Sequence, residues 1–485
     1  SRGFVNQNFQ PKWLKMDIVG DVSKIKNRGN AFELERSLYG LAMPRKLKLA
    51  FLPEELIASS IIDSQQVLRT DYLADYLSES GNQYGGVSPS ILVIEAETEF
   101  FRFKTISQFT DGSITKALYR GHQEIGNYAI EDLLTAAVAG GDYLANNVYA
   151  DGSFAYSYFP KTDVYSRDYN ILRHAGTIFS LLQLYEVTED PALLATAENA
   201  IGYLLHAIDI CPHEVQPVGC VVEDGEIKLG GNGLALLALA KYIEITGERQ
   251  TLGVMTLLAA WIEGSQNSDG EFAIHKESFP ERSPIDFISQ YYPGEAIFGL
   301  TQLYALDGNS KWIDMAEAAV DWLIDVRDFG ISDDDLPHDH WLLYGIYELY
   351  QIRPKPEHLA HAFRISNAIM DSQNLSPEYP DWYGTYYIPP RSTPTATRSE
   401  AFCSAYKLAQ QIGDLDQSKR ILTAYEDNVG FQLITQFQPE TLMYLSNPQA
   451  AMGGFHTELT NYEIRIDYVQ HNISSLLCLY EILSE

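Results

Sequence analysis

The sequence predicts a mainly α-helical protein in which residues 125–485 form a closed ring of six helical hairpins, an (α/α)6 toroid. Three observations lead to this fold class. Similar apolar helix ends recur along the chain, the loops alternate between short and long, and 46% of the 485 residues are hydrophobic, which is enough for one large core. Residues 1–124 follow a different pattern and precede the ring as a smaller domain.

The region 1–124 is predicted to be a small α+β or β-rich domain. Short apolar runs at 46–52 and 90–106 predict strands, and Asp111-Gly112 predicts a hairpin turn. A helix is expected between the two runs, at about 65–78. The sequence of this region indicates no particular chemistry.

From about residue 128 the chain changes to helical periodicity with an internal repeat. Six helix ends carry Tyr or Leu in the same phase, usually before a turn rich in Gly, Asp or Pro. The aligned positions are Tyr185, Tyr242, Tyr304, Tyr350, Leu408 and Tyr480. Successive positions lie 46 to 72 residues apart, which is the length that two helices and two loops need. The repeat therefore predicts helical hairpins.

Each hairpin is expected to supply one outer helix and one inner helix that is richer in Ala, Gly and Leu. The outer helices are expected at about 128–147, 191–207, 249–264, 311–326, 356–372 and 417–434. The inner helices are expected at about 171–187, 231–245, 294–306, 340–351, 397–411 and 468–483. Long loops precede the inner helices and short joints follow them. Because every second helix then starts at the same face, the inner-helix starts should border one cavity.

Composition excludes several functions. The formal charge of −31, from 34 basic and 65 acidic residues, disfavours nucleic acids and anionic membranes as partners. No apolar run is long enough for a membrane span, and no phosphate-binding or dinucleotide-binding glycine motif predicts a cofactor. Four cysteines and the lack of a signal segment indicate the cytoplasm, although a removed secretion signal is compatible with the sequence. Cys211 and Cys220 are interpreted as free buried thiols that would pair only in an exported protein.

Five short segments carry a resemblance: YSRDYNILRHAG, SQYYPGEA, DHWLLYGI, TATRSEAF and EIRIDYVQHN. With the hairpin repeat, they resemble the (α/α)6 superfamily of six-hairpin glycosidases, sugar 2-epimerases and related polysaccharide enzymes. The resemblance covers about three quarters of the chain. It implies a carbohydrate-active protein with a glycan or small sugar as its partner. No family's catalytic motif matches residue by residue, so the resemblance assigns no catalytic role.

Polar residues gather at the predicted inner-helix starts. Five carboxylates there are candidates for acid–base catalysis, and helix capping or pairing with arginine is the alternative role of each. They are Asp168, Glu295, Asp339, Glu400 and Asp467. Further candidates would contact the substrate, with Tyr and Trp as stacking surfaces. They are Tyr165, Arg167, Arg173, Asn232, Tyr291, Tyr292, Trp341, Arg398, Arg465 and Tyr468.

The arginines in this set have two possible roles. A cation in the first turn of a helix opposes the helix dipole, so something must compensate it. The structural role pairs Arg167 with Asp168, Arg398 with Glu400, and Arg465 with Asp467. The functional role binds a carboxylate, sulfate or phosphate of the substrate.

Three histidines, His174, His340 and His471, fall within one turn of inner-helix starts. A histidine pair can act as acid and base in sugar epimerisation, because the imidazole pKa lies near neutrality. Structural hydrogen bonding is the alternative role. Their scattered spacing gives no metal motif, and the sequence predicts no metal site.

The leading hypothesis is a glycoside hydrolase that acts on an anionic or amino-sugar-containing glycan. The alternatives are a sugar or uronate epimerase or isomerase that uses histidine pairs, and a non-catalytic glycan-binding or scaffold toroid. Two carboxylates facing each other across the cavity would favour hydrolysis, whereas two histidines at one point would favour epimerisation.

Overall fold

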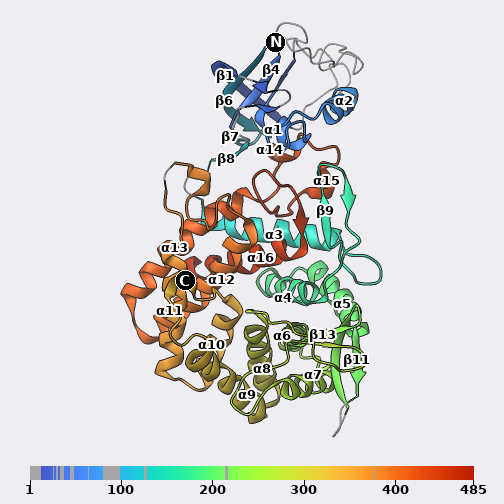
Figure 1. Cartoon of the computed structure of the whole chain (residues 1–485), viewed down its shortest axis with the longest axis vertical. Helices are drawn as coiled ribbons and strands as arrows, with labels where there is room; N and C mark the ends of the chain where they lie inside the picture. Colours follow the sequence, from blue (N-terminus) through green and yellow to red (C-terminus); the bar gives the residue numbers. More distant parts are fainter. Residues whose placement is uncertain are drawn as a thin grey trace.

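The computed structural model describes residues 13–484 apart from 26, 29–30, 33–37, 44–48, 64, 80–98, 125–127, 213–216 and 377. Helices dominate from Ile130 onward, and an antiparallel sheet occupies the N-terminal part (Figure 1). The fold class predicted from the sequence is confirmed.

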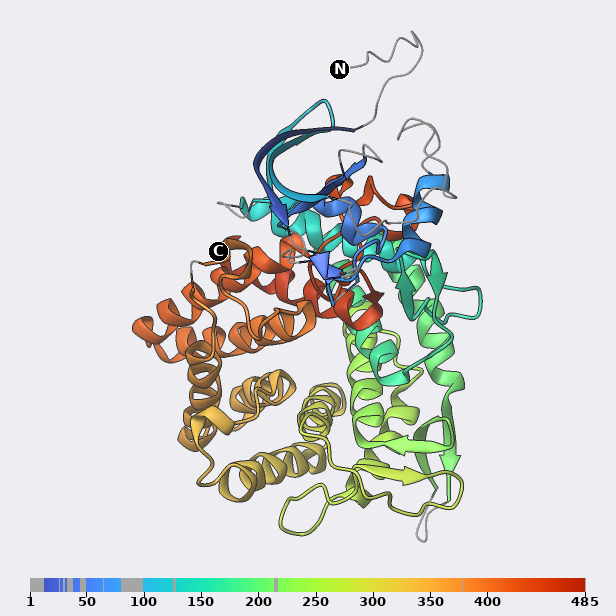
Figure 2. The same cartoon turned by 45° about the horizontal axis from the view of Figure 1, so that its top comes forward.

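Six helices form the inner layer of the toroid, and each contacts the next in a closed cycle. In ring order they are α4 (Ile171–Thr188), α6 (Leu229–Thr246), α8 (Tyr292–Asp307), α10 (His340–Ile352), α12 (Ser392–Ile412) and α16 (Ile466–Ser484). The cycle closes because α16 contacts α4 as well as α12 (Figure 2). Their buried apolar residues are mainly Leu, Ile and Ala, which form one continuous core with the outer layer.

The outer layer runs antiparallel to the inner layer through tight joints. It consists of α3 (Ile130–Asn146), α5 (Pro191–His206), α7 (Leu252–Ser265), α9 (Ser310–Trp322) with the π-helix η3 (Leu323–Arg327), α11 (Pro356–Asp371) and α13 (Leu415–Ile434). Five of these helices contact the inner helix that precedes them in sequence. The first outer helix, α3, packs on the last inner helix, α16, instead. The two ends of the helical region therefore form the sixth pair of inner and outer helices.

Local sequence signals account for several helix boundaries. Asn170 and Asp339 cap α4 and α10 by accepting hydrogen bonds from the backbone N–H groups of Arg173 and Leu342. Gly413 ends α12 with a positive φ of 75°, which glycine adopts without strain. The start of α12 was predicted at 397 and lies at Ser392, because Pro394 falls in the first turn, where proline is tolerated.

The N-terminal sheet has the strand order β5-β4-β6-β7-β8, and β1 pairs with β6. The strands are β1 (Leu14–Ile25), β4 (Gly40–Met43), β5 (Leu49–Phe51), β6 (Phe100–Thr110), β7 (Thr115–Tyr119) and β8 (His122–Gln123). The predicted turn at Asp111-Gly112 joins β6 to β7. Residues 90–98 of the second predicted run lie outside the described residues. A separate two-stranded pair joins β2 (Asn27–Arg28) and β3 (Ala31–Phe32).

Two short helices accompany the sheet, α1 (Pro53–Ala58) and α2 (Thr70–Glu79). The sheet lies against the connection between α13 and α16, which contains α14 (Pro439–Leu442) and α15 (Pro448–Ala451) (Figure 1). Lys116 of β7 is 3.9 Å from Glu440 of α14. The sheet therefore contacts the toroid through the same connection that leads into the last inner helix.

Short strands and turns occupy the long loops before the inner helices. One small sheet has the order β10-β9-β15 and another the order β11-β12-β13-β14. Their strands are β9 (Ser157–Phe159), β10 (Val164–Tyr165), β11 (Ile208–Cys211), β12 (Val218–Glu223), β13 (Glu226–Lys228), β14 (Lys276–Ser278) and β15 (Ile464–Arg465). Two 3-10 turns, η4 (Asp333–Asp335) and η5 (Pro380–Trp382), lie in other loops. These strands do not interrupt the two helical layers.

The interpretation of Cys211 and Cys220 as free thiols is wrong. They form a disulfide between β11 and β12, with Cα atoms 6.1 Å apart. Cys403 and Cys478 form a second disulfide that joins α12 to α16 across 75 positions of sequence. Disulfides are rare in reducing compartments, so the cysteines no longer support a cytoplasmic location.

Within the described part of the chain, none of the helices has the length and apolar character that a membrane span requires.

Candidate functional site

A cavity of about 430 Å³ opens where the inner helices begin. It is bordered by the starts of α4, α8, α10, α12 and α16 and by Leu234 of α6. Its wall contains eleven of the residues predicted from the sequence: Arg173, Tyr291, Tyr292, Glu295, His340, Trp341, Arg398, Arg465, Asp467, Tyr468 and His471. Residues up to about 300 positions apart therefore share one opening.

Three predicted residues lie outside this wall because they belong to an exposed stretch before α4. Tyr165 ends β10, Arg167 is exposed, and Asp168 is exposed and accepts a hydrogen bond from Ser166. In the described structure Arg167 and Asp168 do not form the expected ion pair. Asn170 is the first residue of this stretch to line the cavity, and Tyr169 before it packs on His174 and Tyr203 instead.

Two others are buried in structural roles. His174 follows Arg173 by one residue, and a rotation of about 100° per residue directs it to α5 instead of the cavity. Its ring nitrogens lie 2.9 Å from the Ala200 carbonyl oxygen and 2.7 Å from the Tyr169 hydroxyl. Asn232 accepts a hydrogen bond of 3.0 Å from the Val221 N–H and so holds β12 to α6.

Asp339 and Glu400 are buried but do not line the cavity. Asp339 uses one oxygen as the N-cap of α10, and burial raises its pKa to about 7. Its other oxygen has no hydrogen-bond partner among the described residues. The expected pair between Arg398 and Glu400 is not formed, because Glu400 faces His471 instead.

Glu295 is a buried acid that borders the cavity. Burial and the nearby Asp339 raise its pKa to about 8, although Arg173 acts in the opposite direction. At neutral pH the carboxyl group is therefore mostly protonated and uncharged. A larger residue at position 230 of α6 would force the Glu295 side chain to move, because a Cβ atom there would lie 1.8 Å from Glu295 Oε2.

Asp467 forms the centre of an ion-pair cluster. Arg465 Nε and Nη2 donate to its two oxygens at 2.6 and 2.9 Å, and Arg173 Nε lies 3.1 Å from Oδ2. Arg173 also hydrogen-bonds the Tyr156 hydroxyl. Burial opposes ionisation of Asp467, yet the hydrogen bonds from Arg465 and the two guanidinium charges hold its pKa below the ordinary value. The carboxylate is ionised and the expected pair with Arg465 is present.

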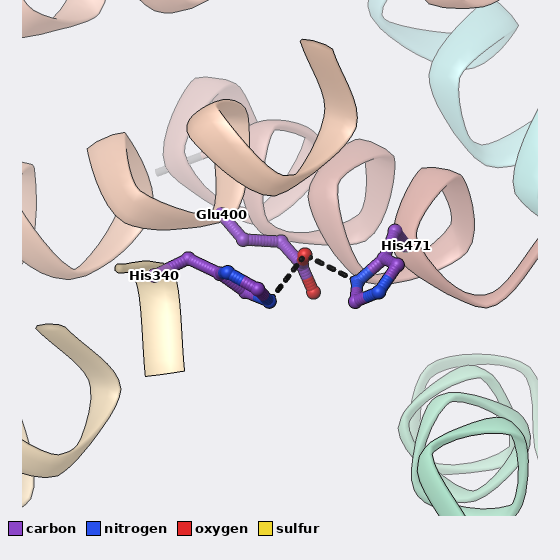
Figure 3. Close-up of side chains that lie close together, drawn as sticks. All are labelled: His340, Glu400 and His471. Carbon is purple, nitrogen blue, oxygen red and sulfur yellow. Dashed lines mark hydrogen bonds and ion pairs between the residues drawn. The ribbon is translucent and has the colours of Figure 1, made fainter. Parts of the chain in front are cut away.

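His340, Glu400 and His471 form a buried triad from α10, α12 and α16 (Figure 3). His471 Nδ1 is 2.7 Å from Glu400 Oε2, and His340 Nε2 is 3.7 Å from the same oxygen. The two imidazole rings are 5.1 Å apart between centroids and stand edge to face. The Tyr344 hydroxyl donates to the other oxygen of Glu400 at 3.4 Å.

Protonation within the triad is set mainly by burial. Burial, His471 and Arg398 hold the pKa of His340 well below its ordinary value, so this ring is neutral. Burial raises the pKa of Glu400, and the charge and hydrogen bond of His471 act against that rise. When Glu400 is ionised, His471 donates Nδ1–H to it, and the lone pair of His471 is then on Nε2. The triad thus offers two imidazoles at the cavity with one carboxylate behind them.

The triad is also the part of the described structure whose donors could hold a metal. The ligand atoms of the two histidines and the glutamate all lie within 4.8 Å of one another. Two imidazoles and one carboxylate are a donor set known from catalytic zinc sites. A bound metal would use the nitrogen lone pairs, so metal binding and acid–base action by the same rings exclude each other. The cavity contains no glycine-rich loop of the kind that binds nucleotide cofactors.

Sequence reasoning missed Arg391 and Tyr387, which both line the cavity. Arg391 immediately precedes α12, and the predicted start of that helix was five residues too late. Tyr387 is in the preceding loop and has a positive φ of 68°. No periodic signal marks such a loop residue. An earlier start for α12, with Pro394 in its first turn, would have revealed Arg391.

No family model and no curated protein sequence matches the chain. Solved structures do match the toroid. Cellobiose 2-epimerase from Bacillus thermoamylovorans B4167 is 13% identical with a TM-score of 0.56, covering 73% of this chain and 100% of its own. D-mannose isomerase is 14% identical with a TM-score of 0.54, covering 73% and 97%. A family 76 glycoside hydrolase from a bovine Bacteroides thetaiotaomicron strain is 12% identical with a TM-score of 0.51, covering 79% and 85%. At these identities the similarity shows the (α/α)6 fold alone.

Proposed function

We propose that the chain is a carbohydrate-active enzyme that isomerises a sugar at its carbonyl end, with His340 and His471 as the acid–base pair. One observation carries this proposal: two imidazoles from different inner helices lie 5.1 Å apart at the wall of one cavity. Fold neighbours that are named for sugar epimerisation and isomerisation add support from analogy.

The spacing of the rings favours isomerisation over epimerisation by two opposed bases. A separation of 5.1 Å leaves no room for a carbon atom between the rings, so both would act from one side of the substrate. One imidazole removes the proton from the carbon next to the carbonyl group and gives an enediol. A proton is then returned to the former carbonyl carbon, while the hydroxyl proton moves from one oxygen to the other. Atoms and electrons balance without a co-reactant.

The surroundings assign a role to each member of the triad. His340 is neutral, as a base must be, because burial holds its pKa low. Glu400 fixes the orientation of His471 through Nδ1 and stabilises this ring when it carries a proton. Trp341, whose ring centroid lies 4.7 Å from that of His340, offers an aromatic surface beside the reacting carbon.

The test is conversion of free aldoses and uronates in D2O, followed by NMR. The wild type should form a ketose and incorporate deuterium at the carbon next to the carbonyl. His340→Gln and His471→Gln should each slow conversion by about a hundredfold or more, the usual contribution of general acid–base catalysis. His206→Gln, on the exposed end of an outer helix, is the matched control. The proposal fails if no sugar in the panel is converted, or if both cavity variants remain fully active.

Glycoside hydrolysis is the second candidate, and one observation favours it. Glu295 and Asp467 line the same cavity, and their surroundings push their pKa values in opposite directions. A protonated acid beside an ionised base is the pattern of many glycosidases. Against this role, both oxygens of Asp467 are already bound by arginine. Release of reducing ends from glycans, lost in Glu295→Gln but kept in His340→Gln, would establish hydrolysis instead.

A further inference from the structure

Two arginines on the cavity wall share one tyrosine. The guanidinium carbons of Arg391 and Arg398 lie 5.0 and 5.3 Å from the ring centroid of Tyr387. Arg398 also lies 4.6 Å from the ring centroid of Tyr386. Tyr387 and the two arginines line the cavity, and they come from the start of α12 and the loop before it. Two like charges thus lie beside one tyrosine ring at the opening.

Neither guanidinium has an acidic partner in the described structure. Arg398 hydrogen-bonds only neutral groups: His338 Nδ1 at 3.1 Å, the Pro394 carbonyl oxygen at 2.9 Å and the Tyr387 hydroxyl at 3.3 Å. Burial and the charge of Arg398 lower the pKa of His338 to about 4, so this ring is neutral and accepts the bond. Arg391 is exposed, and among the described residues its guanidinium contacts the ring of Tyr387.

The whole cavity is deficient in negative charge. Four arginines line it, Arg173, Arg391, Arg398 and Arg465, whereas Asp467 is its ionised carboxylate. The other lining acid, Glu295, is uncharged below its pKa of about 8. This contrasts with a chain whose formal charge is −31. An excess of positive charge that no side chain neutralises indicates an anionic ligand.

We infer that Arg391 and Arg398 bind the carboxylate of an acidic sugar, so the substrate is a uronic acid. This inference rests on the proposed function for the sugar and for the reacting end. The fork of a guanidinium matches the two oxygens of a carboxylate. Both arginines and both histidines line the same cavity of about 430 Å³, so a sugar held there by its carboxylate lies in the space that the histidines border.

The inference is tested by calorimetric binding of D-glucuronate, D-galacturonate, D-glucose and D-glucose 6-phosphate at low and high salt. Wild-type protein should bind at least one uronate about tenfold or more tightly than glucose, and added salt should weaken that binding. Arg391→Gln and Arg398→Gln should each weaken uronate binding about tenfold. Arg167→Gln removes an exposed arginine that lies outside the cavity and should change nothing.

Three outcomes would overturn the inference: equal binding of glucose and both uronates, uronate binding that is insensitive to both substitutions, or arginine-dependent binding of the phosphate ester alone. The last outcome would assign the pair to a phosphorylated sugar. Binding does not require turnover. If uronates bind through the arginines but are never isomerised, the proposed function is wrong, whereas the assignment of Arg391 and Arg398 as the carboxylate-binding site is retained.

Discussion

Two pairs of arginines on the same cavity wall differ in what neutralises them. Arg173 and Arg465 converge on Asp467, which lies within 3.1 Å of both and is ionised. Arg391 and Arg398 converge on Tyr387, which offers a ring and a hydroxyl group but no charge. The first pair holds α4 and β15 to the start of α16. The charges of the first pair are neutralised by Asp467 within the protein, whereas those of the second pair can interact with a bound anion.

The largest expected effect concerns Glu295, the acid that could add a second negative charge beside Arg173. Its pKa is about 8 in the folded protein and about 4.5 in an unfolded chain. Between these values the folded state holds a proton that the unfolded state has lost, so stability falls as pH rises from about 4.5 to about 8. Relative to Glu295→Gln, the wild type should lose up to about 4 kcal/mol across this window.

Urea unfolding at pH 5 and pH 9 measures this difference. Glu281→Gln, at an exposed loop position, should leave the wild-type pH dependence unchanged. Parallel pH profiles for the wild type and Glu295→Gln would show that the carboxyl is ionised throughout, and that Arg173 has two acidic partners instead of one.

Asp467→Asn removes the charge that neutralises Arg173 and Arg465, so that this pair, like Arg391 and Arg398, has no ionised partner. It leaves two guanidinium groups without their carboxylate, and breaking a buried ion pair costs about 3 kcal/mol or more. We expect a loss of about 2 to 3 kcal/mol in the free energy of unfolding, since both arginines are partly exposed. The double variant Arg391→Gln/Arg398→Gln should change stability by less than about 1 kcal/mol. Equal losses in the two variants would remove the distinction between the pairs.

Thr393→Asp makes the opposite change by supplying a carboxylate to the second pair. Thr393 is in the first turn of α12 and lines the cavity between the two arginines in sequence. An acidic residue near a helix N-terminus is favourable by about 0.3 to 1 kcal/mol, and the arginines add to this effect. We expect a small gain in stability by urea unfolding together with weaker uronate binding. A gain in stability with unchanged uronate affinity would place the ligand elsewhere in the cavity.

The layout of the site followed from the repeat, whereas the direction of individual side chains did not. Alternating layers place every inner-helix start at one face, so Arg173, Glu295 and His471 were predicted at the same cavity. Within a single turn, however, Arg173 faces the cavity and His174 faces α5. Hydrophobic periodicity gives the apolar face of a helix, but it does not decide which of two adjacent polar residues points inward.

The sequence also could not predict which residues contact each other between helices. The pairing of His471 with Glu400, and of Cys403 with Cys478, depends on α12 and α16 lying side by side. These residues are 71 and 75 positions apart. No local spacing rule connects them, so only the closed ring shows which residues become partners.

Closure of the ring also sets an order of events during synthesis. Of the toroid helices, α3 is made first, and its main partner α16 follows more than 300 residues later. Until α16 docks, apolar faces of α3, α4 and α12 lack a cover, and the cavity lacks Asp467 and His471. Contacts between such distant segments are slow to form, and exposed apolar faces invite aggregation meanwhile. A nascent chain of this protein therefore completes its largest core and its site in the same step, when α16 docks.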